Sequence, residues 1–196
     1  YLIIPSERAG THAAWLNLVI SLAIELVGRD RSSRKVTFLL DEFCNLGYLP
    51  NVLRGMAQYR SQGVQAWLIC QQINQLDRLY GIEGRREIMG MAEIVNVFGA
   101  WEPDTLKMLS TWLGNTTQRQ LSTSITPSIE GGNFGFNVNA SDYSAPLMRP
   151  EDIRIMPSDE QLIFYRNLPP IRAKKISYLT RRAWKKAAAP NPYHRK

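Results

Sequence analysis

Short apolar runs and amphipathic stretches alternate along the first two-thirds of this chain. Residues 36–40 (VTFLL) form an apolar run with a β-branched Thr37 inside it, which is typical of a strand buried on both faces of a parallel sheet. Strands alternating with helices predict an α/β fold with right-handed crossovers. Three strands of this kind are expected, at residues 36–40, 64–70 and 94–99. The helices expected between and after them cover residues 52–62, 73–79, 83–92 and 103–113.

The pattern changes after Gly114. Residues 115–145 are rich in Ser, Thr, Asn and Gly, and the segments QRQLSTSIT and FGFNVNASDYS alternate polar and apolar positions at period two. That alternation predicts a solvent-facing hairpin with its turn in PSIEGGN, and a low-complexity loop is the alternative. A short helix in RPEDIRIM and two strands at 161–165 and 173–178 are expected to follow.

The longest apolar stretch runs from Ala13 to Val27 and is interrupted by three polar residues. Asn17, Ser21 and Glu25 recur every four residues, so on a helix they form one polar stripe. The stretch is also shorter than the roughly 20 apolar residues that a transmembrane helix needs. We therefore expect an amphipathic helix of a soluble domain here, preceded by a strand in the first five residues.

Charge is distributed unevenly along the chain, whose formal net charge is +7. Residues 166–196 contain ten Lys or Arg and no Asp or Glu, whereas the first 165 residues are close to neutral. We expect residues 180–196 to be a disordered basic tail that attracts nucleic acid, anionic lipid or an acidic partner, or that merely keeps the chain soluble. Trp184, beside Arg182 and Lys185, could stack on bases or cover a local apolar spot.

Two cysteines, Cys44 and Cys70, lie at the ends of the first two apolar, strand-like runs. Two are too few for a disulfide framework or a zinc site, so we interpret them as small core residues in a reducing compartment.

Chemistry-bearing side chains gather where these two strands end. Asp41 and Glu42 follow the first strand, and Gln71 follows the second. An acid pair at this place is typical of nucleotide hydrolysis: Asp41 would hold Mg²⁺ and Glu42 would orient the attacking water, unless the pair is only a solvated acidic turn. Gln71 would sense the γ-phosphate, or is simply a polar strand end.

Arg60 lies near the end of the helix between the two strands and is the fourth candidate. An arginine finger stabilises charge on a phosphoryl group bound to a neighbouring subunit. The alternative is a cation that the helix dipole favours at a helix carboxyl end.

Three segments resemble the conserved stretches of type IV secretion coupling proteins, the VirD4/TraG family of conjugation motors. They are LLDEFCNLG, YRSQGVQAWLICQQINQLDRLYG and NVFGAWEPDTLKMLSTWLGNTT. The similarity in element order extends over residues 1–179. Several short motifs in the right order are far more specific than any one of them.

This resemblance implies a RecA-like P-loop NTPase fold with three layers, a mostly parallel sheet and helices on both faces. Residues 1–179 would form its carboxyl-terminal part, with 115–145 as an inserted hairpin or loop. ATP and Mg²⁺ would be the cofactors, with Asp41, Glu42 and Gln71 at the nucleotide and Arg60 acting in trans. The resemblance also implies a homo-hexamer at the cytoplasmic face of the bacterial inner membrane, anchored by an N-terminal segment. Its partners would be DNA or protein effectors, the relaxosome and the secretion channel.

One element of that family is missing from the sequence. No G-x-x-x-x-G-K-[ST] loop occurs, and the glycine-rich segment 131–135 lacks the lysine. In the family that loop would precede Tyr1, so we expect this polypeptide alone to be inactive as an ATPase. A related DNA-pumping or pilus-associated motor is the near alternative. A non-hydrolysing binding module that docks DNA or a relaxosome protein through the basic tail is the distant one.

Overall fold

The computed structural model describes residues 9–30, 35–127 and 134–188. Contacts divide the chain into two compact units, residues 1–95 and 96–196. The strand expected in the first five residues and the hairpin turn expected at 128–133 lie outside the described residues. The predicted domain bounds, 1–179 and 180–196, stay a prediction.

The first unit contains a parallel pair of strands, as the apolar runs predict. β1 pairs with β2 from Val36↔Val64 to Leu40↔Leu68. Gly63, at φ 87°, ends the helical segment before β2, and Gly81, at φ 72°, breaks α3 at the expected place. The elements are α1 (Ala9–Arg29), β1 (Val36–Leu40), η2 (Phe43–Leu46), α2 (Pro50–Gln58), η3 (Arg60–Gln62), β2 (Val64–Leu68) and α3 (Ile73–Met91).

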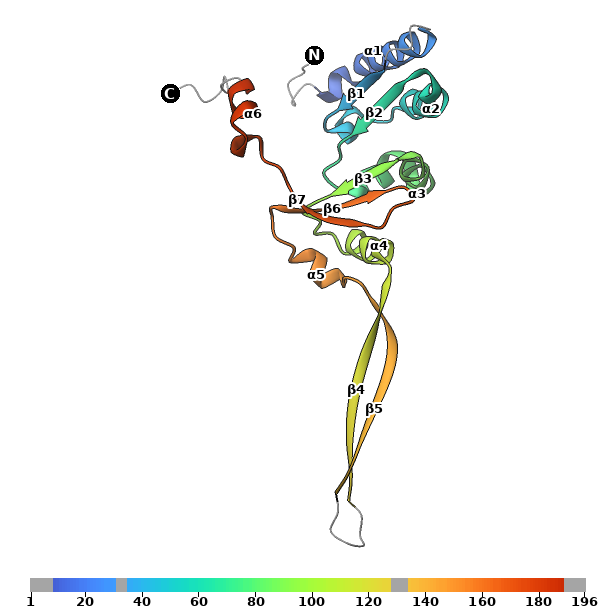
Figure 1. Ribbon diagram of the computed structural model, residues 1–196. Helices are drawn as coiled ribbons and strands as arrows, with labels where there is room; N and C mark the ends of the chain where they lie inside the picture. Colours follow the sequence, from blue (N-terminus) through green and yellow to red (C-terminus); the bar gives the residue numbers. More distant parts are fainter. Residues whose placement is uncertain (1–8, 31–34, 128–133, 189–196) are drawn as a thin grey trace. The chain divides into compact units, whose positions relative to one another are not determined.

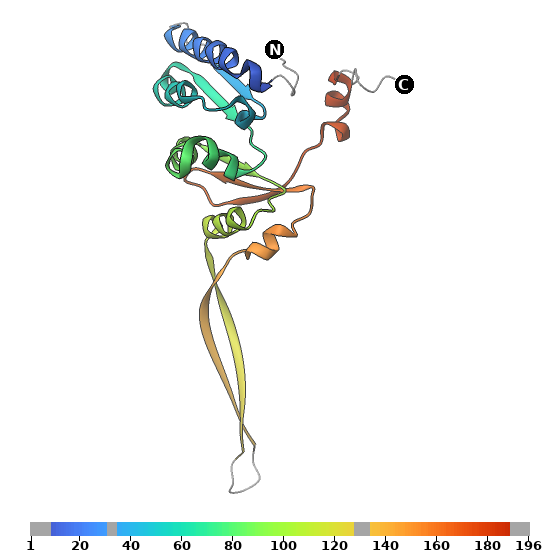
Figure 2. The same cartoon turned by 180° about the vertical axis from the view of Figure 1, so that it is seen from behind.

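The core of the first unit lies on one face of the β1–β2 pair. α1 and α2 lie side by side against that face (Figures 1 and 2). Within this unit the opposite face of the pair is open: Leu39 is 61% exposed and Trp67 is 65% exposed. The buried cluster consists of Ile20, Ile24, Leu40, Phe43, Leu49, Val52, Leu76 and Ile88.

Two residues of the polar stripe of α1, Asn17 and Ser21, are partly buried. Asn17 donates from Nδ2 to the carbonyl of Tyr48 at 3.0 Å, and Ser21 Oγ donates to Asn17 Oδ1 at 3.1 Å. The exposed stripe of the helix is instead apolar and consists of Trp15, Leu18, Leu22 and Leu26. By length and composition alone, Thr11–Arg29 is a candidate membrane span, although its Ile20 and Ile24 belong to the core cluster.

The second unit is built around a three-stranded sheet in the order β3–β6–β7. β6 and β7 are antiparallel, with Glu160↔Lys174 and Ile163↔Ile171 as the ends of their register. β7 begins two residues before the expected strand and ends at Lys174, and η4 follows at Tyr178. The elements are β3 (Ile94–Val97), α4 (Pro103–Leu113), β4 (Asn115–Pro127), β5 (Phe134–Pro146), α5 (Pro150–Arg154), β6 (Glu160–Tyr165), β7 (Ile171–Lys174), η4 (Tyr178–Thr180) and α6 (Arg182–Ala187).

A long hairpin is inserted between α4 and α5, where period-two alternation predicts one. β4 and β5 pair antiparallel from Asn115↔Pro146 to Pro127↔Phe134. The ribbon extends away from the two helices (Figure 1). Across the hairpin, Arg119 Nε donates a hydrogen bond to Asp142 Oδ1 at 2.9 Å, and this bond holds the pKa of Arg119 above its usual value.

Two helices cover the sheet of the second unit and enclose its core. α4 begins where the Glu102 carboxylate accepts hydrogen bonds from the N–H groups of Asp104 and Thr105, which lower the pKa of Glu102. The buried cluster consists of Leu106, Leu109, Leu113, Ile153 and Leu162.

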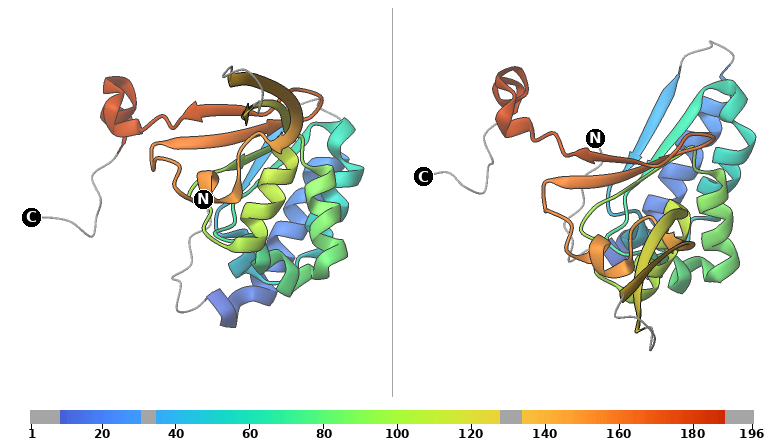
Figure 3. Two further views of the ribbon diagram at one scale, coloured as in Figure 1. Left: turned by 90° about the horizontal axis from the view of Figure 1, so that it is seen from below. Right: turned by 60° about the horizontal axis from the view of Figure 1, so that its bottom comes forward.

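The start of the basic tail contains a short helix. Residues 182–187 form α6, which stands apart from the sheet of its unit and contacts η4 (Figure 3). The Ala, Lys and Arg residues of this segment have high helix propensity. Arg181 Cζ also lies 5.2 Å from the ring centre of Trp184, a cation–π distance. Residues 189–196 lie outside the described part of the chain.

Candidate functional site

Three of the four candidate residues lie at one edge of the first unit's parallel strands. Asp41 and Glu42 directly follow β1, and Gln71 comes three residues after the end of β2. Two backbone hydrogen bonds hold these strand ends together: Ile69 N–H donates to Leu40 O at 3.1 Å and Phe43 N–H to Ile69 O at 2.9 Å. Ligands of open α/β sheets bind outside the carboxyl ends of strands, which is this edge.

The acid pair has an unusual local geometry. Glu42 adopts a left-handed backbone conformation, φ 51° and ψ 43°, which is uncommon for a residue other than glycine. Asp41 Oδ1 accepts the N–H of Glu42 at 3.1 Å. Both side chains are exposed. The turn therefore presents two carboxylates to solvent immediately beyond the strand.

Asn45 is a site residue that the sequence reasoning missed. Its Nδ2 donates to Glu42 Oε2 at 2.5 Å, and its backbone N–H donates to the carbonyl of Glu42 at 2.7 Å. The sequence signal that could have identified Asn45 is its spacing of three residues from Glu42, because residues three apart lie above one another in a 3₁₀ turn. Asn45 thereby fixes the orientation of the Glu42 carboxylate.

A buried aromatic contact anchors this turn to the core. Phe43 is fully buried and stacks on Tyr80 with ring centres 5.8 Å apart. The Tyr80 hydroxyl accepts the N–H of Leu49 at 3.0 Å. Burial of the phenol raises the pKa of Tyr80 to about 12, so the group stays neutral. The acid pair is thus attached to a rigid support.

Gln71 lies in the short bend between β2 and α3, and its side chain is exposed. The next residue, Gln72, caps α3 together with Gln75, whose Oε1 accepts the Gln72 N–H at 3.4 Å. In the first turn of α3, Asn74 Oδ1 is buried without a hydrogen-bond partner among the described residues. Polar groups therefore continue from the strand end into the first turn of α3.

Arg60 is not brought together with the other three. It begins η3, which enters β2 at its amino end, so it lies at the opposite edge of the strand pair from Gln71. The five residues of β2 span roughly 17 Å at about 3.3 Å each. Arg60 forms an exposed ion pair with Glu93, Nη2 to Oε2 at 3.2 Å. Within one chain it does not share a site with Asp41 and Glu42.

The two cysteines meet beside the acidic edge. Cys44 Sγ and Cys70 Sγ are 3.4 Å apart, and both side chains are partly buried against the core. The hydrogen bond from the Cys70 thiol lowers the pKa of Cys44, because it stabilises the Cys44 thiolate. The same bond and burial raise the pKa of Cys70.

The donor set at this edge fits Mg²⁺ held jointly with a nucleotide. Carboxylate oxygens are ligands that this ion prefers, and it is usually bound through one or two carboxylates together with substrate phosphates. Asp41 has one oxygen that accepts a backbone N–H and a second that is free to face a cation. No group of three or more His, Cys, Asp or Glu side chains in the described residues forms a metal cage of its own.

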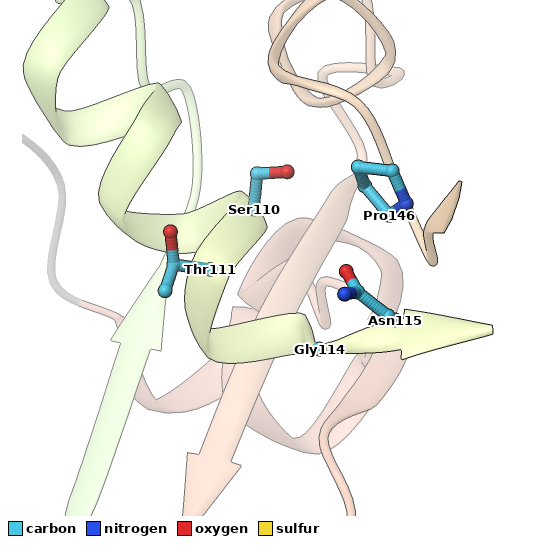
Figure 4. Close-up of a pocket in the computed structure, with 5 residues that line it drawn as sticks. All are labelled: Ser110, Thr111, Gly114, Asn115 and Pro146. Atoms are coloured by element: carbon cyan, nitrogen blue, oxygen red, sulfur yellow. The ribbon is translucent and has the colours of Figure 1, made fainter. Parts of the chain in front are cut away.

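A pocket of about 320 Å³ lies in the second unit, at the base of the hairpin (Figure 4). Two of its hydroxyls already donate to backbone carbonyls: Ser110 Oγ to Met148 O at 2.6 Å and Thr111 Oγ1 to Lys107 O at 2.9 Å. Its lining contains none of the candidate site residues and consists of Ser110, Thr111, Gly114, Asn115 and Pro146. This pocket presents no activated nucleophile.

Solved structures of one protein share this fold. The bacterial conjugative coupling protein TrwB, in an unbound form, matches with a TM-score of 0.68 and 16% identity over 88% of this chain and 39% of that chain. TrwB with the non-hydrolysable ATP analogue ADPNP matches with a TM-score of 0.65 and 15% identity over 86% of this chain and 37% of that chain. The fold and its acidic strand edge define an α/β protein of the RecA-like class.

Sequence comparison places the chain more narrowly. The model of the family "Type IV secretory system Conjugative DNA transfer" matches residues 1–195, and the chain belongs to that family. Protein VirD4 of Agrobacterium fabrum is 26% identical over 165 residues, 84% of this chain and 24% of that protein. The coupling protein VirD4 of Bartonella quintana is 26% identical over 195 residues, 98% of this chain and 30% of that protein. The chain thus spans less than a third of the length of these relatives.

Proposed function

We propose that this chain is the carboxyl-terminal part of the ATPase motor of a type IV secretion coupling protein. The observation that carries the proposal is the register of β1 and β2, which puts Asp41, Glu42 and Gln71 at one strand edge. TrwB structures with ADPNP and with ADP and Mg²⁺ support MgATP as the ligand. In the parent protein, ATP turnover would drive DNA or protein effectors toward a secretion channel.

Each residue at the edge receives a role from its chemistry and position. Asp41 would supply a carboxylate oxygen to hold Mg²⁺, directly or through water, and the ion would neutralise charge on the phosphate oxygens. Glu42, oriented by Asn45, accepts a proton from the attacking water. Gln71 lies where β2 ends and α3 is about to start, so its amide can transmit a change at the γ-phosphate to that helix.

Arg60 acts on a different nucleotide in this proposal. Its place at the opposite edge does not fit a role at the acid pair of the same chain, whereas its exposure suits a contact with a neighbouring subunit. A ring of subunits, six in the implied assembly, would bring it to a neighbour's phosphates. Release from Glu93 would accompany that contact.

In this proposal the phosphate-cradling loop is supplied by another part of the parent polypeptide, since these residues contain no such loop. The chain by itself is therefore expected to release no phosphate from ATP above the rate of a Glu42→Gln control. Inner-membrane attachment and the relaxosome and channel partners belong to the same proposal for the parent protein. If the isolated chain hydrolyses ATP at steady state and Glu42→Gln abolishes that activity, the result contradicts the proposal that the site is shared between this chain and another part of the parent polypeptide.

The decisive experiment compares Asp41→Ala and Glu42→Gln in the parent polypeptide. Glu42→Gln should lower kcat about 10²–10⁴-fold while nucleotide binding is retained, because only proton acceptance is lost. Asp41→Ala should weaken binding of MgATP. Glu87→Gln, the same change at an exposed carboxylate of α3, is the matched control and should keep normal turnover. Normal turnover in both site variants would reject the assignment.

A second candidate rests on the basic carboxyl-terminal segment. Ten Lys or Arg and no acidic residue in 166–196 would suit a module that binds DNA or an acidic partner without hydrolysis. Unchanged DNA transfer by the Glu42→Gln parent protein would favour this candidate over the motor.

A further inference from the structure

Cys44 and Cys70 form a pair of thiols that the nucleotide chemistry does not use. Their Sγ atoms are 3.4 Å apart, and they are the only cysteines in the sequence. Cys44 directly follows Phe43, and Cys70 directly follows Ile69. The N–H of Phe43 donates a hydrogen bond to the carbonyl of Ile69 at 2.9 Å. The backbone therefore holds the two thiols together even though they are 26 positions apart in the chain.

The distance is short enough for a covalent bond after a small local movement. A disulfide needs sulfur atoms about 2.0 Å apart, so the two sulfurs have to approach by little more than 1 Å, about the reach of a side-chain rotation. Because both side chains are only partly buried, an oxidant that is itself small can reach at least one of the two sulfurs. An inert pair of core thiols needs neither this proximity nor this exposure.

We propose that Cys44 and Cys70 are a thiol oxidation site that forms an intramolecular disulfide with a low-molecular-weight disulfide, such as oxidised glutathione, as the oxidant. The Cys44 thiolate attacks one sulfur of glutathione disulfide, and one glutathione leaves as its thiolate. Cys70 then attacks the Cys44 sulfur of the mixed disulfide, and the second glutathione leaves. Two thiol protons are released, and two electrons pass to the oxidant.

Cys44 is the attacking sulfur because, once it has lost its proton, the Cys70 thiol 3.4 Å away can donate a hydrogen bond to the Cys44 thiolate. That bond lowers the pKa of Cys44 and, with burial, raises the pKa of Cys70. The order of the two steps follows from this difference. The formation of the bond itself follows from the distance between the sulfurs.

The bond would tie together the two segments that carry the candidate site. Cys44 belongs to η2, which starts directly after Glu42, and Cys70 directly precedes Gln71. A disulfide would hold the acid pair at a fixed distance from the start of α3. This consequence rests on the proposed function, whereas formation of the disulfide does not.

The experiment treats the folded chain with oxidised glutathione, alkylates the remaining thiols and determines the intact mass. The expected product is a monomer two hydrogen atoms lighter than the reduced chain, with neither cysteine alkylated and no glutathione attached. Unfolding in guanidinium before oxidation should slow formation of this product at least about tenfold, because the thiols then meet only by chain diffusion. Two alkylated thiols, a stable mixed disulfide or a cross-linked dimer from the folded chain would each overturn the proposal.

Single variants test the order of attack. Cys70→Ser should stop at the first step and keep one glutathionyl group on Cys44. Cys44→Ser should react with glutathione disulfide severalfold more slowly than Cys70→Ser, because burial still raises the pKa of Cys70 when Cys44 is replaced, whereas a hydroxyl at position 70 can still donate a hydrogen bond to the Cys44 thiolate. Equal rates for the two variants would overturn the assignment of Cys44 as the attacking thiol.

A third measurement follows ATP turnover by the parent polypeptide. Oxidation should lower turnover at least about tenfold, and dithiothreitol should restore it, because the acid pair is then held at a fixed distance from the start of α3 and Gln71 cannot move relative to it. The Cys44→Ser, Cys70→Ser double variant should not respond to the oxidant. Undiminished turnover of the oxidised protein would overturn the effect on the site. No turnover even when reduced would contradict the proposed function, and the mass measurement would still decide the disulfide.

Discussion

At the scale of single residues, Tyr80 supports the turn that carries the acid pair. Its ring stacks on Phe43 and also contacts Tyr48, with ring centres 5.2 Å apart. Its hydroxyl accepts the N–H of Leu49, a residue with no exposed surface. A buried N–H that loses its acceptor costs free energy, because water cannot replace the partner. Through its ring and its hydroxyl, Tyr80 of α3 therefore connects the turn at Phe43 to the start of α2.

Tyr80→Phe removes that oxygen and keeps the ring. We expect the free energy of unfolding to fall by about 1–3 kcal/mol, measured by urea denaturation near neutral pH. Burial raises the pKa of Tyr80 to about 12, above the value near 10 of an unfolded chain, so neutral Tyr80 contributes stability below about pH 10. That contribution is lost as the pH rises through about 12, and the difference between variant and parent should shrink there.

Tyr48→Phe is the matched control for this prediction. Tyr48 is 58% exposed, so loss of its hydroxyl should leave the free energy of unfolding nearly unchanged. Equal effects of the two substitutions would show that the Tyr80 hydroxyl does not hold the Leu49 N–H.

At the scale of elements, the β4–β5 hairpin is attached to its unit only through its base, among the described residues. There Leu147 N–H donates to Gly114 O at 2.9 Å, and Ala145 is buried. Further out, the side chains of Leu121 and Val138 are 66% and 61% exposed. A two-stranded ribbon contributes little stability to the domain that carries it. The unit's core is formed by α4, α5 and β6 instead.

Replacement of residues 118–143 by Asn-Gly should therefore leave the second unit folded. The two residues suit a tight hairpin turn and keep 115–117 paired with 144–146. We expect a cooperative thermal transition by circular dichroism, with a midpoint close to that of the full chain. Leu109→Ala, at a fully buried position, is the contrasting variant and should cost about 2–5 kcal/mol. Loss of cooperative unfolding in the shortened chain would mean that the hairpin is part of the core.

At the scale of the whole molecule, positive charge is concentrated toward the carboxyl end. Two of these charges, in β7, are already paired: Arg172 with Glu160 at 2.5 Å and Lys174 with Asp159 at 3.6 Å. Six basic residues follow Thr180 and have no acidic neighbour in sequence. If nucleic acid is a partner, these six should carry most of the salt-sensitive affinity.

Truncation after Thr180 tests this expectation directly. For double-stranded DNA, the slope of log affinity against log salt should flatten by up to about 5, because each phosphate that is no longer neutralised removes about 0.9 from the slope. Arg54→Gln, which removes one exposed charge from α2, is the control and should change the slope by no more than about 1. A slope that is already flat for the full chain would exclude the tail as a DNA-binding segment.

Much of the fold and the acid pair could be predicted from the sequence because their signals are local. The apolar run of 36–40 ends directly on Asp41 and Glu42, so the strand and its acidic end are adjacent in the chain. The same holds for Pro103 at the start of α4 and for Gly81 at the break of α3. Period-two alternation likewise marked the two strands of the hairpin. Local propensity and backbone geometry determine such features.

Only the tertiary structure decided which of these features meet. The register of β1 and β2 places Gln71 beside the acid pair, puts Arg60 at the opposite edge and brings Cys44 to within 3.4 Å of Cys70. The packing of α1 likewise directs Asn17 toward the carbonyl of Tyr48 and leaves apolar side chains of that helix exposed. Contacts between distant residues depend on how elements pack, and no periodicity along the chain encodes that.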